Sequence, residues 1–240
     1  MDALHIHIYP DEETWAQHTA EAIRDLLRRT VEQRGRATLA LSGGHTPKPV
    51  YTRLARMKDI PWEHIFIYWG DERYVPHGDP RSNYRMARET LLDHIAVPED
   101  HVFPMPTQFE TPEEGARAYE ATLRATVAGG RFDLILLGLG TDCHTASLFP
   151  HTPALEEEQR WVVPNRGPDI PRLTFTYPLI NRARTVYFLV TGASKHTPVR
   201  QVLYGAADRL ACPARGVRPE GTCHWWLDAA AGPDVYKEDA

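Results

Sequence analysis

The segment GLGTDCHTASLFP places Asp142, Cys143 and His144 side by side, directly after an apolar run. Histidine is suited to general-base work near neutral pH, and a nearby carboxylate can orient the ring or support its cationic form. We therefore predict His144 as a candidate general base with Asp142 close to it. A histidine that is merely hydrogen-bonded within a loop is the alternative interpretation.

The cysteine in this segment suggests two other kinds of chemistry. A zinc site is disfavoured, because zinc takes three or four ligands and the adjacent Cys143 and His144 are badly spaced for chelation. Cys212 lies in a loop without matching histidines, and we expect no metal. A thiolate nucleophile at Cys143 stays an open alternative, which needs a base that is not its neighbour in sequence.

A second cluster, LSGGHTP, is typical of an anion site. A strand runs into Gly43 and Gly44, and a helix is predicted to begin at Thr46 with Pro47 in its first turn. Glycines let backbone N–H groups approach a phosphate, and a helix N-terminus favours negative charge. The spacing matches neither common nucleotide motif. We predict that Ser42, Gly43, Gly44 and Thr46 bind a phosphate, with an ordinary turn as the alternative.

Two further clusters carry acids and cations. In GDER, one of the acids Asp71 and Glu72 together with Arg73 can orient a water and hold an oxyanion or a phosphate. Neighbouring residues point in different directions, so only one or two of this group face a site. Arg172 and Lys195 are further candidate phosphate ligands, and Lys195 is one of only four lysines in the chain. Solvated surface charges are the alternative interpretation.

Short apolar runs, typical of strands, alternate with helical patterns along the chain. The predicted strands cover residues 4–9, 37–44, 64–76, 101–105, 132–140, 185–192 and 223–231, and residues 172–180 are predicted as a strand or a strand-to-helix unit. Alternating strands and helices predict an α/β fold: a doubly wound, mostly parallel, Rossmann-like sheet with helices on both faces. Ligands bind at the carboxyl ends of such strands. We therefore expect the four polar clusters to meet at one rim.

Capping residues mark where the predicted helices begin and end. Asp11 or Thr14 begins the first helix and Gly35 ends it. Threonine, proline and two acids in TPEEG are typical of another helix start. The predicted helices therefore run from residue 11 or 14 to 35, from 46 to about 57, from 82 to about 92, from 111 to 127, and onward from 195.

Composition narrows the class of protein. The chain has 240 residues with a net charge of −5 and no evident basic patch, so no nucleic-acid partner is expected. No run approaches the roughly 18 apolar residues of a membrane span, and the N-terminus lacks the pattern of a signal peptide. Three cysteines without a C-x-x-C spacing fit a reducing cytoplasm. We predict one domain over residues 1–240, as a monomer or small homo-oligomer.

Five segments, in order, resemble the glucosamine-6-phosphate isomerase/6-phosphogluconolactonase family. They are LSGGHTP, WGDERYVPHGDPRSNYRMARETLL, FDLILLGLGTDCHTASLFP, PRLTFTYPLINRARTVYFLVTGASK and CHWWLDAAA. The resemblance implies a glucosamine-6-phosphate deaminase-like fold. The deaminase relatives carry a Glu where this chain has Phe149 and tend to have a Tyr at the position of Arg73. Both differences favour the lactonase branch.

Lactonase membership implies hydrolysis of 6-phospho-D-glucono-1,5-lactone in the pentose phosphate pathway, without a cofactor or metal. It also implies His144 as the base, with Asp71, Arg73, Asp142, Arg172 and Lys195 around the substrate. The family usually has glycine at the position of Cys143, where a positive φ would strain a cysteine. Alternatives are an amino-sugar-phosphate isomerase or deaminase, a sugar-phosphate sensor, and a relative that binds without turnover.

Overall fold

Two almost entirely apolar strands lie at the centre of the main sheet and are buried along their whole length. They are β2 (Ala37–Leu41) and β6 (Leu134–Leu137), and such runs are typical of parallel strands covered on both faces. The structure is a computed structural model that describes residues 4–233. In it, β2 pairs in parallel with β6 on one side and with β3 (Ile65–Trp69) on the other.

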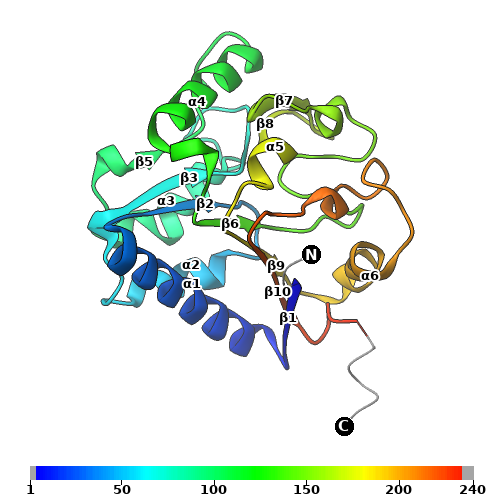
Figure 1. The fold of residues 1–240 in the computed structure, drawn as a ribbon, viewed down its shortest axis with the longest axis horizontal. Helices are drawn as coiled ribbons and strands as arrows, with labels where there is room; N and C mark the ends of the chain where they lie inside the picture. The colour runs from blue at the N-terminus through cyan, green and yellow to red at the C-terminus, as the bar shows by residue number, and fades with distance from the viewer. Residues whose placement is uncertain (1–3, 234–240) are drawn as a thin grey trace.

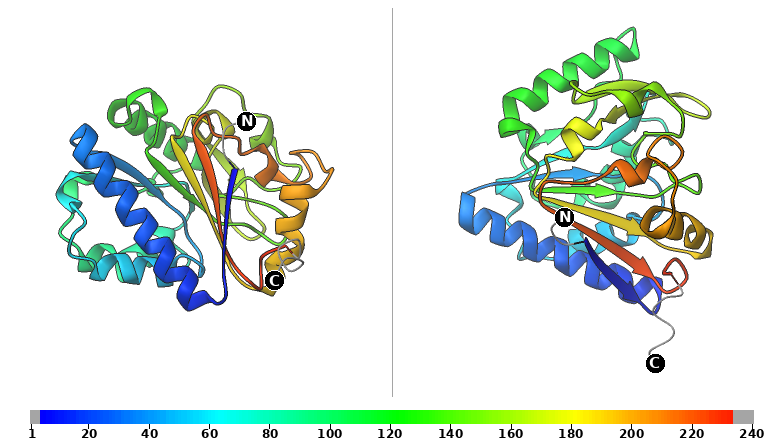
Figure 2. Two further views of the ribbon diagram at one scale, coloured as in Figure 1. Left: turned by 60° about the horizontal axis from the view of Figure 1, so that its bottom comes forward. Right: turned by 45° about the vertical axis from the view of Figure 1, so that its right-hand side comes forward.

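Within the described residues, the main sheet has seven strands, and every neighbouring pair is parallel. The order across the sheet is β1 (Leu4–Tyr9), β10 (Thr222–Asp228), β9 (Thr185–Val190), β6, β2, β3 and β5 (Val102–Phe103). Figure 2 shows these strands running in one direction between two layers of helices. The predicted doubly wound α/β fold is confirmed.

The helices cover both faces of this sheet. On one face, α1 (Glu12–Arg34) contacts β1, β2 and β10 and packs on α2 (Lys48–Arg56). On the other side lies α6 (His196–Tyr204), well separated from α1 in Figure 1. None of the helices within residues 4–233 combines the length and the apolarity that crossing a membrane requires.

A second, small sheet stands beside the main one and was not predicted. It contains β4 (Asp71–Arg73), β8 (Pro171–Phe175) and β7 (Val162–Arg166), paired antiparallel in the order β4-β8-β7. Helix α4 (Pro112–Thr126) packs against β7 and β8 (Figure 1). Sequence patterning failed here because β4 is three charged residues long and carries no apolar alternation.

Most predicted helix ends are confirmed. The Asp11 carboxylate accepts a hydrogen bond from Thr14 N (2.7 Å), and Gly35 ends α1 with a φ of 74°. Thr111 and Glu114 form a capping box at α4. The remaining helices are α3 (Asn83–Thr90), α5 (Tyr177–Ile180) and short 3-10 turns at Trp62–His64, Leu92–His94, Glu99–His101, Ala128–Gly130, Pro153–Glu156, Ala193–Lys195 and Pro213–Gly216.

The helix start predicted at Thr46 is wrong. Helix α2 begins at Lys48, after Pro47, and no side chain caps it. Instead, Lys48 N donates to His45 O at 3.1 Å, so a tight turn precedes the helix. The proline rule placed the helix start one residue too early, because residues 44–47 fold as a turn that the rule does not distinguish from a first helical turn.

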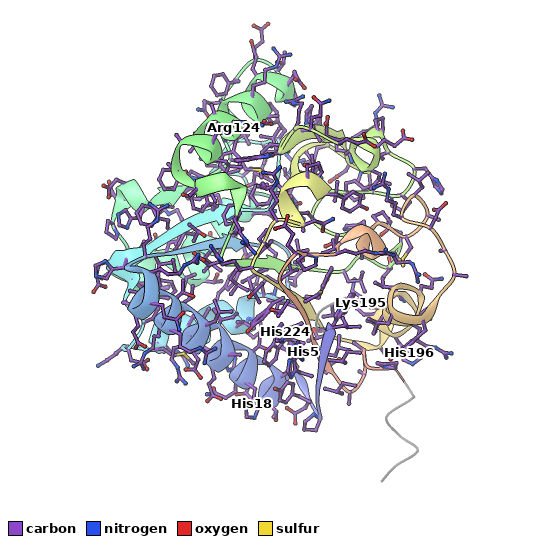
Figure 3. All side chains as sticks on the ribbon, in the orientation of Figure 1. His5, His18, Arg124, Lys195, His196 and His224 are labelled. Carbon is purple, nitrogen blue, oxygen red and sulfur yellow. The ribbon has the colours of Figure 1, made fainter. Side chains whose placement is uncertain are left out.

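Three histidines stack where edge strand β1 meets β10, on the face that α1 covers. The rings of His5 and His224 lie 4.4 Å apart (Figure 3), and His7 Nε2 lies 3.1 Å from His224 Nδ1. Burial, with the charges of His5 and His7, lowers the pKa of His224 from 6.5 to about 4. The neighbouring titratable groups are Tyr187 of β9, Tyr9 and His18, with Asp25 and Arg29 of α1 near Tyr187.

Acid should therefore loosen this edge of the sheet. A histidine whose folded pKa is depressed binds more protons when unfolded, so stability falls as pH drops from 6.5 toward 4. We expect the wild-type protein to lose about 1–2 kcal/mol more unfolding free energy between pH 7 and 5 than the His224→Gln variant. Urea titrations at both pH values measure this. Exposed His64→Gln is the control, and an equal loss in His224→Gln would contradict the prediction.

Candidate active site

Four polar clusters meet at one edge of the main sheet. The strands β9, β6, β2 and β3 are consecutive neighbours in the sheet and run parallel. The clusters TGASK, GLGTDCHTAS, SGGHTP and GDER follow these strands in turn, so they share the carboxyl rim, as predicted. The right-hand view of Figure 2 shows the strands ending on the same side. The fold thus assembles a site from segments far apart in sequence.

A tight turn at this rim presents the predicted base. Cys143 N donates to Gly140 O at 3.1 Å, and Gly140 N donates to His144 O at 2.8 Å. A Cβ added to Gly140 would lie 2.0 Å from His144 Nδ1 and 2.5 Å from Asp142 Oδ1. Only glycine leaves room at that position, because the His144 and Asp142 side chains both fold back over its Cα.

His144 is oriented by Asp142. Its Nδ1 lies 2.5 Å from Asp142 Oδ1, and its backbone N–H donates to the same oxygen at 3.1 Å. The hydrogen bond to His144 lowers the pKa of Asp142 and keeps the carboxylate charged. With Nδ1 engaged, Nε2 is the nitrogen left to meet a substrate or water. The ring is 33% exposed and lies 4.7 Å from the ring of Phe149.

Cys143 has the positive φ that a glycine would adopt freely. Its φ is 65°, and its buried thiol donates to Gln201 Oε1 at 3.1 Å. Burial, together with the nearby Cys212, raises the pKa of the Cys143 thiol to about 12. A buried neutral thiol is a poor nucleophile at neutral pH, so the geometry disfavours the thiolate alternative. Within residues 4–233, no group of three or more His, Cys, Asp or Glu is placed to hold a metal.

A buried tyrosine holds the SGG turn in place. The Tyr51 hydroxyl accepts from Ser42 N at 3.0 Å and donates to Ser42 O at 2.9 Å. Gly43 packs so closely on Asn83 that an added Cβ would lie 1.8 Å from Asn83 Oδ1, and Gly44 has a φ of 87°. The buried Ser42 Oγ and Asn83 Oδ1 have no hydrogen-bond partner. The glycine turn therefore lies against Asn83, and it contains or contacts two buried polar atoms that have no partner.

Arg73 and Arg172 lie directly opposite each other in the β4–β8 pair. The Arg172 side chain is only 9% exposed and donates from Nη2 to Asp169 Oδ1 at 2.8 Å. Its Nε and Nη1 are buried without a partner. Burial and the neighbouring Arg73 lower the pKa of Arg172. Two neighbouring arginines, one of which has two buried donors without a partner, indicate an anion-binding position.

The middle residue of GDER has a structural role that the sequence did not reveal. Glu72 points away from Asp71 and Arg73 and is buried. Its carboxylate accepts from Arg73 N and Asn83 N at 2.7 Å, Tyr84 N at 2.8 Å and Ser82 Oγ at 3.0 Å. Burial raises the pKa of Glu72, and these hydrogen bonds oppose the shift. Glu72 thus links α3 to β4. The co-occurrence of DER and SNY in the sequence was the signal that could have revealed this link.

Lys195 lies close enough to Asp142 for their charges to interact. It ends the 3-10 turn before α6 (Figure 3). Burial lowers the pKa of Lys195, and the charge of Asp142 opposes the shift, so the ammonium lies within the field of the His144–Asp142 pair. The loop is held by Asp228, whose two carboxylate oxygens accept from Gly192 N at 3.0 Å. Asp228 was not singled out from the sequence.

Comparison with known proteins places the chain in a family. Residues 10–226 match the family model described as glucosamine-6-phosphate isomerases/6-phosphogluconolactonase. This chain belongs to that family. It is 50% identical over 214 residues to a 6-phosphogluconolactonase of Synechocystis, covering 87% of this chain and 89% of the relative. A Nostoc 6-phosphogluconolactonase is 43% identical over 235 residues, covering 96% of this chain and 98% of its own.

A solved structure agrees with this family assignment. The crystal structure of a 6-phosphogluconolactonase from Thermotoga maritima superimposes with a TM-score of 0.85 at 30% identity, covering 94% of this chain and 99% of that one. The ten residues predicted from the sequence lie in the four rim clusters and on β8. The sequence did not reveal the residues that hold these ten in place, which are Tyr51, Glu72, Asn83, Ser147, Asp169 and Asp228.

Position 143 allows a test of backbone strain. A cysteine with positive φ costs about 1 kcal/mol, which offsets the loss of the buried thiol in Cys143→Gly. We expect Cys143→Gly to fold with an unfolding free energy within about 1 kcal/mol of wild type and to keep its activity. Cys143→Val should cost about 2 kcal/mol or more, because β-branched residues tolerate positive φ poorly. Urea denaturation measures both; a collapse of activity in Cys143→Gly would revive the thiol interpretation.

Proposed function

We propose that this protein hydrolyses 6-phospho-D-glucono-1,5-lactone to 6-phospho-D-gluconate in the oxidative branch of the pentose phosphate pathway. The observation that carries the proposal is the 2.5 Å contact between His144 Nδ1 and Asp142, which leaves Nε2 for water, near the buried Arg172 with its two unmet donors. The names of the relatives described above support the same substrate.

In the proposed reaction, His144 acts twice. Its neutral Nε2 takes a proton from a water molecule, and the water oxygen attacks the lactone carbonyl. The tetrahedral intermediate then collapses, the bond to the ring oxygen breaks, and the imidazolium returns the proton to that oxygen. The Asp142 carboxylate holds the tautomer with hydrogen on Nδ1 and stabilises the imidazolium between the two transfers.

The charged groups around His144 take the remaining roles. Arg73 steadies the oxyanion, and Asp71, which does not contact His144, orients the attacking water or a substrate hydroxyl. Arg172, Lys195 and the Ser42–Thr46 turn hold the 6-phosphate, which fixes the ring against His144. No cofactor enters this scheme. Each step uses only groups that can exchange protons or form hydrogen bonds.

We also infer that residues 1–240 act as one domain in the cytoplasm. Hydrogen bonds from the loop after β6 to β4, β7 and β8 support the first point, because the site draws on both sheets. The three cysteines, all free in the structure, fit a reducing compartment. Cell fractionation with a tagged protein tests the location, and limited proteolysis tests whether the sheets separate.

The purified protein should accelerate lactone hydrolysis above the spontaneous rate. His144→Ala should lower the enzymatic excess by about 10²–10⁴-fold, and Asp142→Asn should lower kcat because the tautomer is no longer fixed. Exposed His64→Ala, far from the rim, serves as the control. A near wild-type kcat in His144→Ala would refute the mechanism. Ammonia release from glucosamine 6-phosphate would instead support the isomerase/deaminase branch.

The phosphate assignment has its own test in the choice of substrate. Arg172→Gln and Lys195→Met should each raise KM for the phosphorylated lactone by about 10–100-fold, the worth of a charged hydrogen bond. The unphosphorylated lactone should be a poor substrate, and its kcat/KM should hardly change in either variant. Initial rates with both lactones measure this. An equal loss on both would show that these cations do not bind phosphate.

A further inference from the structure

One residue of the loop after β6 is tied to all three strands of the small sheet. Ser147 is 1% exposed, and its Oγ donates to Asp71 Oδ2 on β4 at 2.6 Å. Its N–H donates to Thr174 Oγ1 on β8 at 3.1 Å, and its carbonyl accepts from Asn165 Nδ2 on β7 at 2.8 Å. Thus Ser147, three residues beyond His144, joins the histidine's loop to the strand that carries Asp71.

The backbone around Ser147 is strained. Cys143, Ala146 and His151 have φ values of 65°, 49° and 58°, and they are the non-glycine residues with positive φ within residues 4–233. Such conformations persist only where surrounding contacts over-determine them. Ala146 directly precedes Ser147, so the three hydrogen bonds of Ser147 act next to the strained position and hold the loop in place.

The same serine fixes the orientation of a buried acid. Asp71 is 9% exposed, and its second oxygen accepts from Asn83 Nδ2 at 3.2 Å. Each carboxylate oxygen has two lone pairs, so one acceptor position on each oxygen remains for other partners. Asp71 and Arg73 share a face of β4 with Arg172 across from them. With its carboxylate held from two sides, Asp71 presents its remaining lone pairs to the site in one orientation.

We propose that Ser147 is a positioning residue for hydrolysis: its hydroxyl holds the Asp71 carboxylate and the His144 loop in one fixed geometry. This inference rests on the lactonase function proposed above. Asp71 belongs to the small sheet and His144 to a loop of the main sheet, and Ser147 links the two by a direct side-chain contact. Catalysis loses about 10²-fold when reacting groups are displaced by about 1 Å. Removing the hydrogen bond between Ser147 and Asp71 should therefore lower kcat.

Ser147→Ala should lower kcat by about 10–100-fold and leave KM within about twofold, because the phosphate-binding cations stay in place. The matched control is Thr145→Val, since Thr145 is equally buried in the same loop but its hydroxyl donates to Gly138 O at 2.8 Å. Its kcat should stay within about threefold of wild type. An equal fall in both variants would overturn the inference, because it would reflect general loosening of the loop.

A double-mutant cycle shows whether Ser147 acts through Asp71. In the Asp71→Ala background, Ser147→Ala should change kcat by no more than about twofold, because the hydroxyl then has no carboxylate to hold. A further tenfold fall would overturn the inference. Urea denaturation midpoints of the wild type, the two single variants and the double variant measure the same coupling without an activity assay. If the wild-type protein has no lactonase activity, the proposed function fails. Non-additive changes in the urea midpoint would then still support the link between Ser147 and Asp71, whereas additive changes would overturn it.

Discussion

The site depends on the pairing of β6 with β2, in which Leu39 lies opposite Leu134 and Ala40 opposite Ile135. From β2 the sheet continues to β3 and β5 on one side, and from β6 to β9, β10 and β1 on the other. The winding reverses at this pair, and ligands of open α/β sheets bind beyond the carboxyl ends of the strands at such a switch point. The glycine turn after β2 and the histidine turn after β6 both lie at this switch point.

Around this switch point the protein combines local strain with dense hydrogen bonding. The turn that carries His144 closes over a glycine that leaves no space for a side chain, and it continues through residues with positive φ. Contacts with the small sheet hold this loop, while Glu72 holds α3 and Tyr51 holds the SGG turn. Rigid support of this kind lets a histidine and its acid keep one relative orientation without a bound ligand.

The acids and the cations of the site differ in how completely they are paired. Acids pair with the groups that must be oriented: Asp142 with the His144 ring, and Asp228 with the backbone before Lys195. The cations, in contrast, are only partly compensated, since two nitrogens of Arg172 are buried without a partner next to Arg73. Burying such donors is costly unless an anion meets them, so this side of the site favours an anionic ligand.

The sequence by itself determined the strand and helix alternation, the meeting of four polar clusters at one rim, and His144 as the candidate base. These follow from local apolar patterns and from the geometry common to all parallel sheets. Only the tertiary structure showed that Asp142, and not Asp71, contacts His144, that β4 belongs to a separate antiparallel sheet, and that Ser147 bonds to Asp71. Those contacts join residues distant along the chain, or depend on one turn's dihedral angles, which no local pattern specifies.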